Sequence, residues 1–416
     1  DYESIIAGSA AAAKDHRFEI ETKVTPYDFD PFLPDNPFLR RVPGTTLAAE
    51  CDCLGEFLGA GYLPCVQTDA IRRYVTEAMK KKVDRFTIRI DRVGNRIFNS
   101  AQEANLYAYH RFIADPSLTS DAVMSDWAKR RWPKCAKEMQ ELARDSFRLV
   151  RATQFVDENV AFHQNPVAPN FKYVKAGGVF AAFRENADLH MSEQQWGMQF
   201  TRRTPGHKAI LSEKDEAVKL ADEGLAKLEA LKDRLDPAEY ARQHRAWSIA
   251  TKATRAIRAF TRCAVAYFKD MAEGCDAPKR LVAGLDVTAP DSSFTNYHPC
   301  AAFALKVPHG TAVSNGWTNA GGVVDRWAKD ADDVFREALE WREIAADAAL
   351  PADDAAGAWH RLTFGSAMIA GRECDVDVLD AAAVERHFNR LAGPIFRRAG
   401  DLVGKTLTHF YSVSWE

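Results

Sequence analysis

The sequence contains no run of about 18 or more apolar residues, so it offers no segment expected to span a bilayer. Its eight cysteines are scattered along 416 residues, which is not the density of a disulfide scaffold. Cys51 and Cys53 are too close in one predicted strand to bridge easily, and no second CxC or CxxC pair completes a zinc site. We therefore expect both to be buried thiols.

The sequence also lacks a strong excess of positive or negative charge. The formal net charge of −3 gives no reason to expect nucleic acid or an anionic membrane as a partner. A hydrophobic content of 46% with 27% charged residues is typical of a globular protein long enough for about two or three domains. The chain begins without a methionine or a signal segment and stops on a predicted strand. Both ends are expected to be cuts through folded domains, and the sequence indicates no compartment.

Strand and helix patterns alternate in the first third of the chain. Strands are predicted at 17–24, 46–54 and 85–91, and helices at 69–81 and 101–113. This spacing is that of βα units and predicts a parallel sheet. Only about three such units are present, too few to close a barrel on their own.

Helical periodicity dominates from Ser117 onward. Thr119 or Ser120 can cap a helix that runs to Arg131, and another helix is predicted over 134–158. Ser212 and Asp215 form a capping-box pattern that opens a helix, and Asp236-Pro237 begins the next. Residues 212–273 are thus predicted to form a long antiparallel helical hairpin. The helical domain that contains it is the candidate surface for a homodimer.

The composition shifts again near residue 275, toward proline, glycine and short β-like segments. Residues 358–369 are predicted to form paired strands, and 381–404 a helix before a final strand. The predicted domains are 1–116, 117–275 and 276–416.

Two carboxylates follow predicted strands directly. Asp28 lies beyond strand 17–24 and Glu56 beyond strand 46–54, the position of catalytic side chains in parallel α/β barrels. Gly55 and Gly59 are expected to turn the backbone and to leave room for a ligand beside Glu56. A pair of acids at neighbouring strand ends suits acid/base chemistry on a glycosidic bond. The alternative is that Asp28 caps a turn and Glu56 pairs with an arginine.

The segments "TPYDFDPFLPDNPF" and "AECDCLGEFLGAGYLPC" resemble the α-glucuronidases of glycoside hydrolase family 67. The helix "AQEANLYAYHRFIADPSLTSDAVMSDW" also matches, and the resemblance covers about residues 15–273. It implies the C-terminal part (the last three βα units) of a TIM (β/α)8 barrel, then an α-helical domain and a short mixed α/β tail, as a fragment of a larger chain. It further implies an inverting hydrolase without metal or organic cofactor.

The resemblance assigns Asp28 and Glu56 as the two carboxylates that position and deprotonate the attacking water. No part of this chain matches the family's general acid, which lies on an earlier strand. Gly55 stands where the family has a glutamine, and two segments of the family's sugar pocket have no counterpart in 159–210. That region offers His163, Arg184, His190, Trp196 and Arg202 instead. The residues expected to contact the sugar are Arg92, Asn95, Asn99 and Trp196.

The tail carries a second resemblance. Ala356 to Asp380 and "GDLVGKTLTHFYSVSWE" resemble the family 106 rhamnosidase group, which makes Glu416 a candidate active-site acid of a second module. Three functions therefore stay open: a glucuronidase-like hydrolase of plant or algal polysaccharide side chains, a rhamnosidase-like activity in the tail, and a non-catalytic carbohydrate-binding module. In each case the expected partner is an oligosaccharide or polysaccharide.

Overall fold

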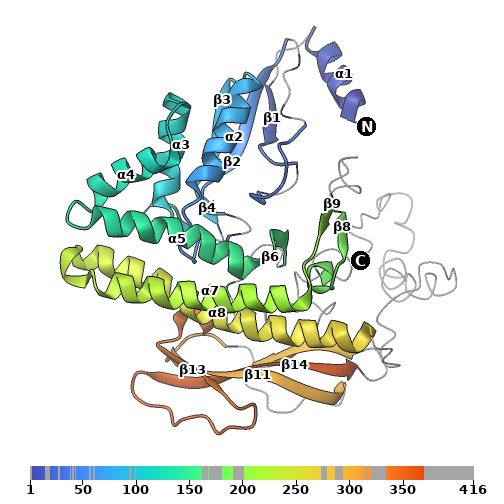
Figure 1. Cartoon of the computed structure of the whole chain (residues 1–416), viewed down its shortest axis with the longest axis vertical. Coiled ribbons are helices and arrows are strands. Elements are labelled where there is room, and N and C mark those ends of the chain that lie inside the picture. Colours follow the sequence, from blue (N-terminus) through green and yellow to red (C-terminus); the bar gives the residue numbers. More distant parts are fainter. Residues whose placement is uncertain are drawn as a thin grey trace, which may run out of the picture. The chain divides into compact units, whose positions relative to one another are not determined.

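The computed structural model (Figure 1) has a mixed α/β fold, with long helices and several small sheets. It describes residues 2–369 except 15–18, 27–28, 38, 40–41, 43, 56–57, 60, 93–94, 99, 162–166, 168–179, 191–200, 273–278, 286–293, 314–315 and 320–333. The chain divides into two compact units, Asp1–Met368 and Ile369–Glu416. The predicted domain boundaries near 116 and 275 both lie within the first unit and stay predictions.

The first sheet has three parallel strands in the order β1-β2-β3. They are β1 (Glu19–Lys23), β2 (Thr46–Asp52) and β3 (Arg85–Arg89). The middle strand β2 is the most apolar and the most buried, while the flanking strands alternate between exposed and half-buried residues. The predicted parallel sheet is thus confirmed.

A partial barrel is not established, because the described residues provide only these three parallel strands. The first crossover also lacks the helix of a βα unit, since described residues between β1 and β2 form turns and loops. Proline at positions 26, 31, 34, 37 and 43 explains this, because proline removes backbone donors and restricts the residue before it.

Helices α2 (Thr68–Lys80) and α3 (Glu103–Ala114) pack on the parallel sheet. The apolar positions of α2 recur at helical spacing and all face one core, in which Ile71, Val75 and Tyr109 are fully or almost fully buried. A short antiparallel ribbon, β4 (Asp91–Arg92) with β5 (Asn95–Arg96), joins β3 to α3. The N-terminal helix α1 spans Tyr2–Ala12.

Helices α4 (Ser120–Arg131) and α5 (Ala136–Gln154) follow. The Thr119 hydroxyl accepts a hydrogen bond from the Ala122 amide at 3.2 Å and so caps α4, as predicted. The predicted helix 134–158 ends early, because β6 (Phe155–Val156) turns back onto β7 (Asn159–Val160). Asp157 and Glu158 make that turn with φ of 46° and 66°, a conformation that no periodicity pattern reveals.

The predicted helical hairpin is present as α7 (His207–Glu229) and α8 (Pro237–Ala272), joined by the 3₁₀ turn η3 (Lys232–Arg234). The capping box predicted at Ser212 is wrong, because α7 begins at His207 with Gly206 as its N-cap. Ile210 is fully buried, so its apolar packing extends the helix upstream of Ser212. The two helices approach closely where a Cβ on Gly224 would lie 1.9 Å from the Trp247 ring.

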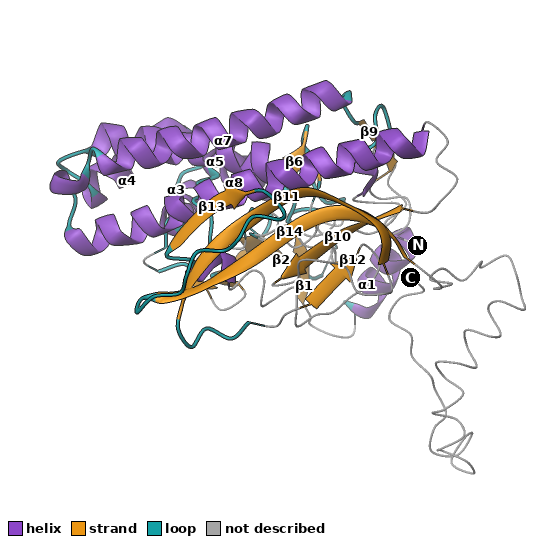
Figure 2. Ribbon diagram, turned by 90° about the horizontal axis from the view of Figure 1, so that it is seen from below, coloured by secondary structure: helices purple, strands orange, loops and turns teal. Residues whose placement is uncertain are grey.

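A five-stranded sheet with the order β12-β10-β14-β11-β13 packs against α8 (Figure 2). Its strands are β10 (Lys279–Leu285), β11 (Phe294–Pro308), β12 (Gly316–Asn319), β13 (Glu340–Ile344) and β14 (Gly357–Ile369). Residues 358–369, predicted as paired strands, instead lie in one long strand, because its pairing with β10 continues through Gly365 and Ser366 without a turn. Phe364 of β14 contacts Phe260 of α8, with ring centroids 6.3 Å apart.

The small elements between α5 and α7 are η2 (Phe180–Phe183) and the antiparallel pair β8 (Asp188–His190) and β9 (Thr201–Arg203). The predicted helix 381–404 and the final strand lie outside the described residues. Among the described helices, none combines the length and the hydropathy that a membrane-spanning segment needs.

Candidate active site

The predicted site residues divide into two groups. Arg92 and Asn95 are Cα partners across the ribbon of β4 and β5, which lies directly after β3. The others lie outside the described residues: Asp28, Glu56, Asn99, Trp196 and Glu416. Their assignments stay predictions.

The segments that contain Asp28 and Glu56 leave the parallel sheet at one edge. β1 and β2 pair in parallel with Lys23 opposite Glu50, so their carboxyl ends lie side by side. The pairing continues past β1, because the Val24 amide donates to the Glu50 carbonyl at 3.0 Å. Beyond β2, the Cys53 amide likewise donates to the Arg89 carbonyl at 3.2 Å. The loops after the two strands therefore start from adjacent positions.

Two cations hold the residue that directly follows Asp28. Lys23 Nζ lies 5.1 Å from the centroid of the Phe29 ring, and Arg89 Cζ lies 5.4 Å from it. Both are within the range of a cation–π contact. Arg89 Nε also lies 3.9 Å from Glu50 Oε1. Since Lys23 ends β1 and Arg89 ends β3, Phe29 ties the loop to both outer strands of the sheet.

Asp30 is a buried carboxylate that sequence reasoning missed. It is fully buried, and its Oδ1 accepts a hydrogen bond from the Phe32 amide at 2.8 Å. Its Oδ2 has no hydrogen-bond partner among the described residues and lies 3.9 Å from Arg202 Nη1. Burial raises the pKa of Asp30 to about 6, although Arg202 and the Phe32 amide oppose the shift.

Arg202, on β9, connects the β1 loop with the turn that follows α5. It donates hydrogen bonds to the carbonyls of Phe32 and Glu158, and its own pKa is lowered by burial. The sequence signal for this arrangement was weak, since Asp30 stands in a proline-rich loop and Arg202 is 172 residues away. Arg202, which the sequence offered in place of the missing sugar-pocket segments, thus has a structural role.

The loop after β2 turns on glycines, as predicted, but these glycines accommodate the protein's own leucines. Gly55 has φ of +74° and Gly59 of +83°. A Cβ on Gly55 would lie 2.5 Å from Leu58 Cβ, and one on Gly59 would lie 2.5 Å from Leu63 Cγ. Leucine side chains therefore occupy the space that a Cβ on either glycine would fill, so the expectation that this space is left for a ligand is wrong.

Asn105 of α3 closes both ends of that loop. Its Nδ2 donates to the carbonyls of Cys53 and Cys65, each at 2.9 Å, and its Oδ1 accepts from the Gln67 amide at 2.9 Å. It is almost fully buried, so each bond replaces contact with water. Asn105 therefore ties Cys53, at the start of the loop after β2, to Cys65 and Gln67 at its end.

No group of three or more metal-ligating side chains occurs among the described residues. Cys51 and Cys53 are free, buried thiols, and burial raises the pKa of Cys51 to about 12. The prediction that Cys51 and Cys53 are buried thiols is confirmed.

Comparison with known proteins assigns no family to this chain. No family model and no curated protein matches this chain. One similar solved structure is a family GH115 4-O-methyl-alpha-glucuronidase with specificity for decorated arabinogalactans. It has 10% sequence identity and a TM-score of 0.34, over 84% of this chain and 54% of the other. The chain therefore spans about half the length of that enzyme, and a likeness of this size assigns neither fold nor activity.

Proposed function

We propose that this chain contributes to a glycoside hydrolase that inverts configuration and removes uronic acid side chains from polysaccharides. The observation that carries the proposal is the parallel pairing of β1 with β2. It starts the loops of Asp28 and Glu56 from neighbouring positions at one sheet edge. The family 67 resemblance of these same loops supports the choice of substrate.

In the proposed reaction, Asp28 and Glu56 together orient one water molecule and take its proton. The water oxygen forms a bond to the anomeric carbon as the glycosidic C–O bond breaks, and the leaving oxygen receives a proton from a general acid. The resemblance provides no match for that acid in this chain. Lys23 and Arg89, held on Phe29, supply positive charge at the same edge, which suits a substrate with a carboxylate.

Hydrolysis of aldouronic acids by the full-length protein tests the proposal. Glu56→Gln is expected to lower kcat by at least about 10²-fold, because the amide cannot accept the proton. Glu77→Gln is the matched control, since Glu77 is a half-buried residue of α2 that pairs with the exposed Lys80. NMR of the first-formed sugar acid is expected to show the anomer opposite to that of the substrate.

Three results would refute the proposal. One is a rate of Glu56→Gln within a few-fold of the wild type. Another is retention of the anomeric configuration. The third is binding of the oligosaccharide without cleavage by the full-length protein, which would favour the carbohydrate-binding module instead.

A further inference from the structure

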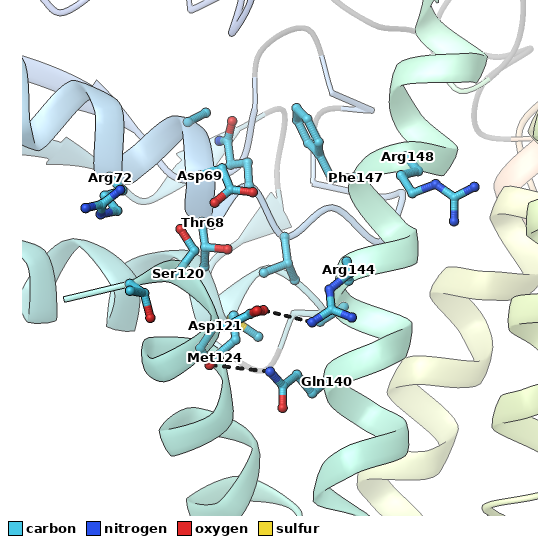
Figure 3. A pocket seen from close by; sticks show the side chains of 15 residues that line it. Thr68, Asp69, Arg72, Ser120, Asp121, Met124, Gln140, Arg144, Phe147 and Arg148 are labelled. Carbon is cyan, nitrogen blue, oxygen red and sulfur yellow. Dashed lines mark hydrogen bonds and ion pairs between the residues drawn. The ribbon is translucent and has the colours of Figure 1, made fainter.

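A cavity of about 540 Å³ lies among α2, α4 and α5. Figure 3 shows the first turns of α2 and α4 on one side and α5 on the other. None of the residues that line it was predicted to act in catalysis or in sugar binding. Its volume is within the range of pockets that bind small molecules.

The charged groups of the cavity favour an anion. Arg72, Arg144 and Arg148 line it, against Asp69 and Asp121. Arg148 also pairs with Asp145 at 3.1 Å and lies 3.7 Å from Glu216, so Arg72 and Arg144 are the two arginines available to a ligand.

The guanidinium of Arg72 is only partly used, since its Nε donates to the Leu118 carbonyl at 2.8 Å. Within the described residues its two terminal nitrogens have no further partner. Arg144 Nη2 pairs with Asp121 Oδ1 at 2.8 Å, but these side chains are 58% and 77% exposed. An exposed pair of this kind contributes little, so a ligand carboxylate can replace Asp121.

The backbone adds to this preference. α2 begins at Thr68, and the side chain of its N-cap Gln67 makes no capping hydrogen bond. Gln67 Nε2 instead donates to the Asp52 carbonyl at 3.5 Å. No N-cap side chain therefore covers the first turn of α2 at the cavity wall, where the helix dipole is positive and Asp69 is the acidic residue of that turn.

The remaining lining suits a polyhydroxylated ring. Thr68 and Gln140 line the cavity with a hydroxyl and an amide group, and Gln140 Nε2 also donates to the Asp121 carbonyl at 3.4 Å. Phe147 and Met124 provide apolar surface beside them. A molecule with one carboxylate, several hydroxyls and an apolar C–H face matches this combination.

We propose that this cavity binds a sugar acid, such as one uronic acid unit of an acidic oligosaccharide, through Arg72 and Arg144. The choice of a sugar acid rests in part on the proposed function, whereas the anion preference rests on the cavity alone. Binding is measured without turnover, so that absence of hydrolysis leaves the result intact.

The experiment follows the ¹³C-methyl resonance of Met124 in the full-length protein, assigned with Met124→Leu. Sodium glucuronate is the ligand, glucose the neutral comparator and inorganic phosphate the simple anion. The test variant is the double substitution Arg72→Gln with Arg144→Gln. The matched control is Arg262→Gln, because Arg262 is 54% exposed and pairs with Asp215 at 3.2 Å on the helical hairpin, much as Arg144 pairs with Asp121.

Glucuronate is expected to shift the Met124 signal, with glucose and phosphate binding at least about tenfold more weakly. The double variant is expected to weaken glucuronate binding about tenfold or more, and Arg262→Gln to leave it unchanged. An unshifted signal, equal affinity for glucose, equal affinity for phosphate, or unchanged affinity in the double variant would each overturn the proposal. Circular dichroism of the variants shows that a loss is not unfolding.

Discussion

Asp30 gives a prediction with a definite sign. In the unfolded chain the Asp30 carboxyl has its ordinary pKa of 3.8, whereas burial raises its pKa in the folded protein to about 6. Between these values the folded state binds the proton more tightly, so the free energy of unfolding falls as the pH rises. The contribution is fully present below about pH 3.8 and is lost as the pH passes about 6.

The magnitude follows from the same two values. Each pKa unit corresponds to about 1.4 kcal/mol, so the full effect is about 3 kcal/mol. Between about pH 4.5 and pH 7.5 the expected loss is about 2 kcal/mol. The other titratable groups that act on Asp30 are Arg202, Arg73 and Glu158. The first two lessen the shift and the third adds to it, and all are included in the value of about 6.

The assay is urea unfolding of the wild type and of Asp30→Asn at both pH values. The free energy of unfolding of the wild type, relative to Asp30→Asn, is expected to fall by about 2 kcal/mol from the lower to the higher pH. Asn36→Ala is the control, because Asn36 donates from the same loop to the Lys23 carbonyl at 2.8 Å but does not titrate. A difference between wild type and Asp30→Asn that is independent of pH, or that changes in the opposite direction, would refute the reasoning.

Three further substitutions test the packing described above. Gly224→Ala is expected to destabilise the protein by about 1–3 kcal/mol in thermal unfolding, because its Cβ meets the Trp247 ring at 1.9 Å. Gly8→Ala has nothing within 4 Å and is expected to stabilise its helix, so equal effects would contradict the close approach. Asn105→Ala removes three hydrogen bonds and is expected to cost about 3 kcal/mol and to increase proteolysis of the loop after β2; unchanged cleavage would contradict the clamp. Lys214→Met leaves two carbonyls at the end of α5 without their buried donor and is expected to cost about 3 kcal/mol in urea unfolding; a stable variant would show that water replaces the ammonium.

The elements with strong periodicity were predictable from the sequence. The strands of the parallel sheet and the helical hairpin have the expected types, because apolar spacing reports which face of an element is buried. The ends of elements were less predictable. α5 stops before Asp157 because of a left-handed turn, and α7 starts before Ser212 because Ile210 is drawn into the core. Such ends depend on tertiary contacts that no local pattern contains.

The candidate site likewise has features that were predictable from the sequence and features that were not. The sequence indicated which loops leave the sheet beside each other, because consecutive strands are usually neighbours in a sheet. It did not indicate Asp30 with Arg202, or the clamp by Asn105, because these contacts join positions far apart in the chain. The role of Gly55 was predicted in part: its positive φ followed from the turn, whereas its contact with Leu58 did not.

The central claim is that Asp28 and Glu56 act on one water molecule at the edge shared by β1 and β2. A double-mutant cycle on kcat/KM for an aldouronic acid tests it most directly, with Asp28→Asn, Glu56→Gln and both together in the full-length protein. Residues that act as a unit are strongly non-additive, so the double variant is expected to be no slower than the slower single variant by more than about threefold. Losses that multiply, or a wild-type protein that hydrolyses no aldouronic acid, would contradict the account.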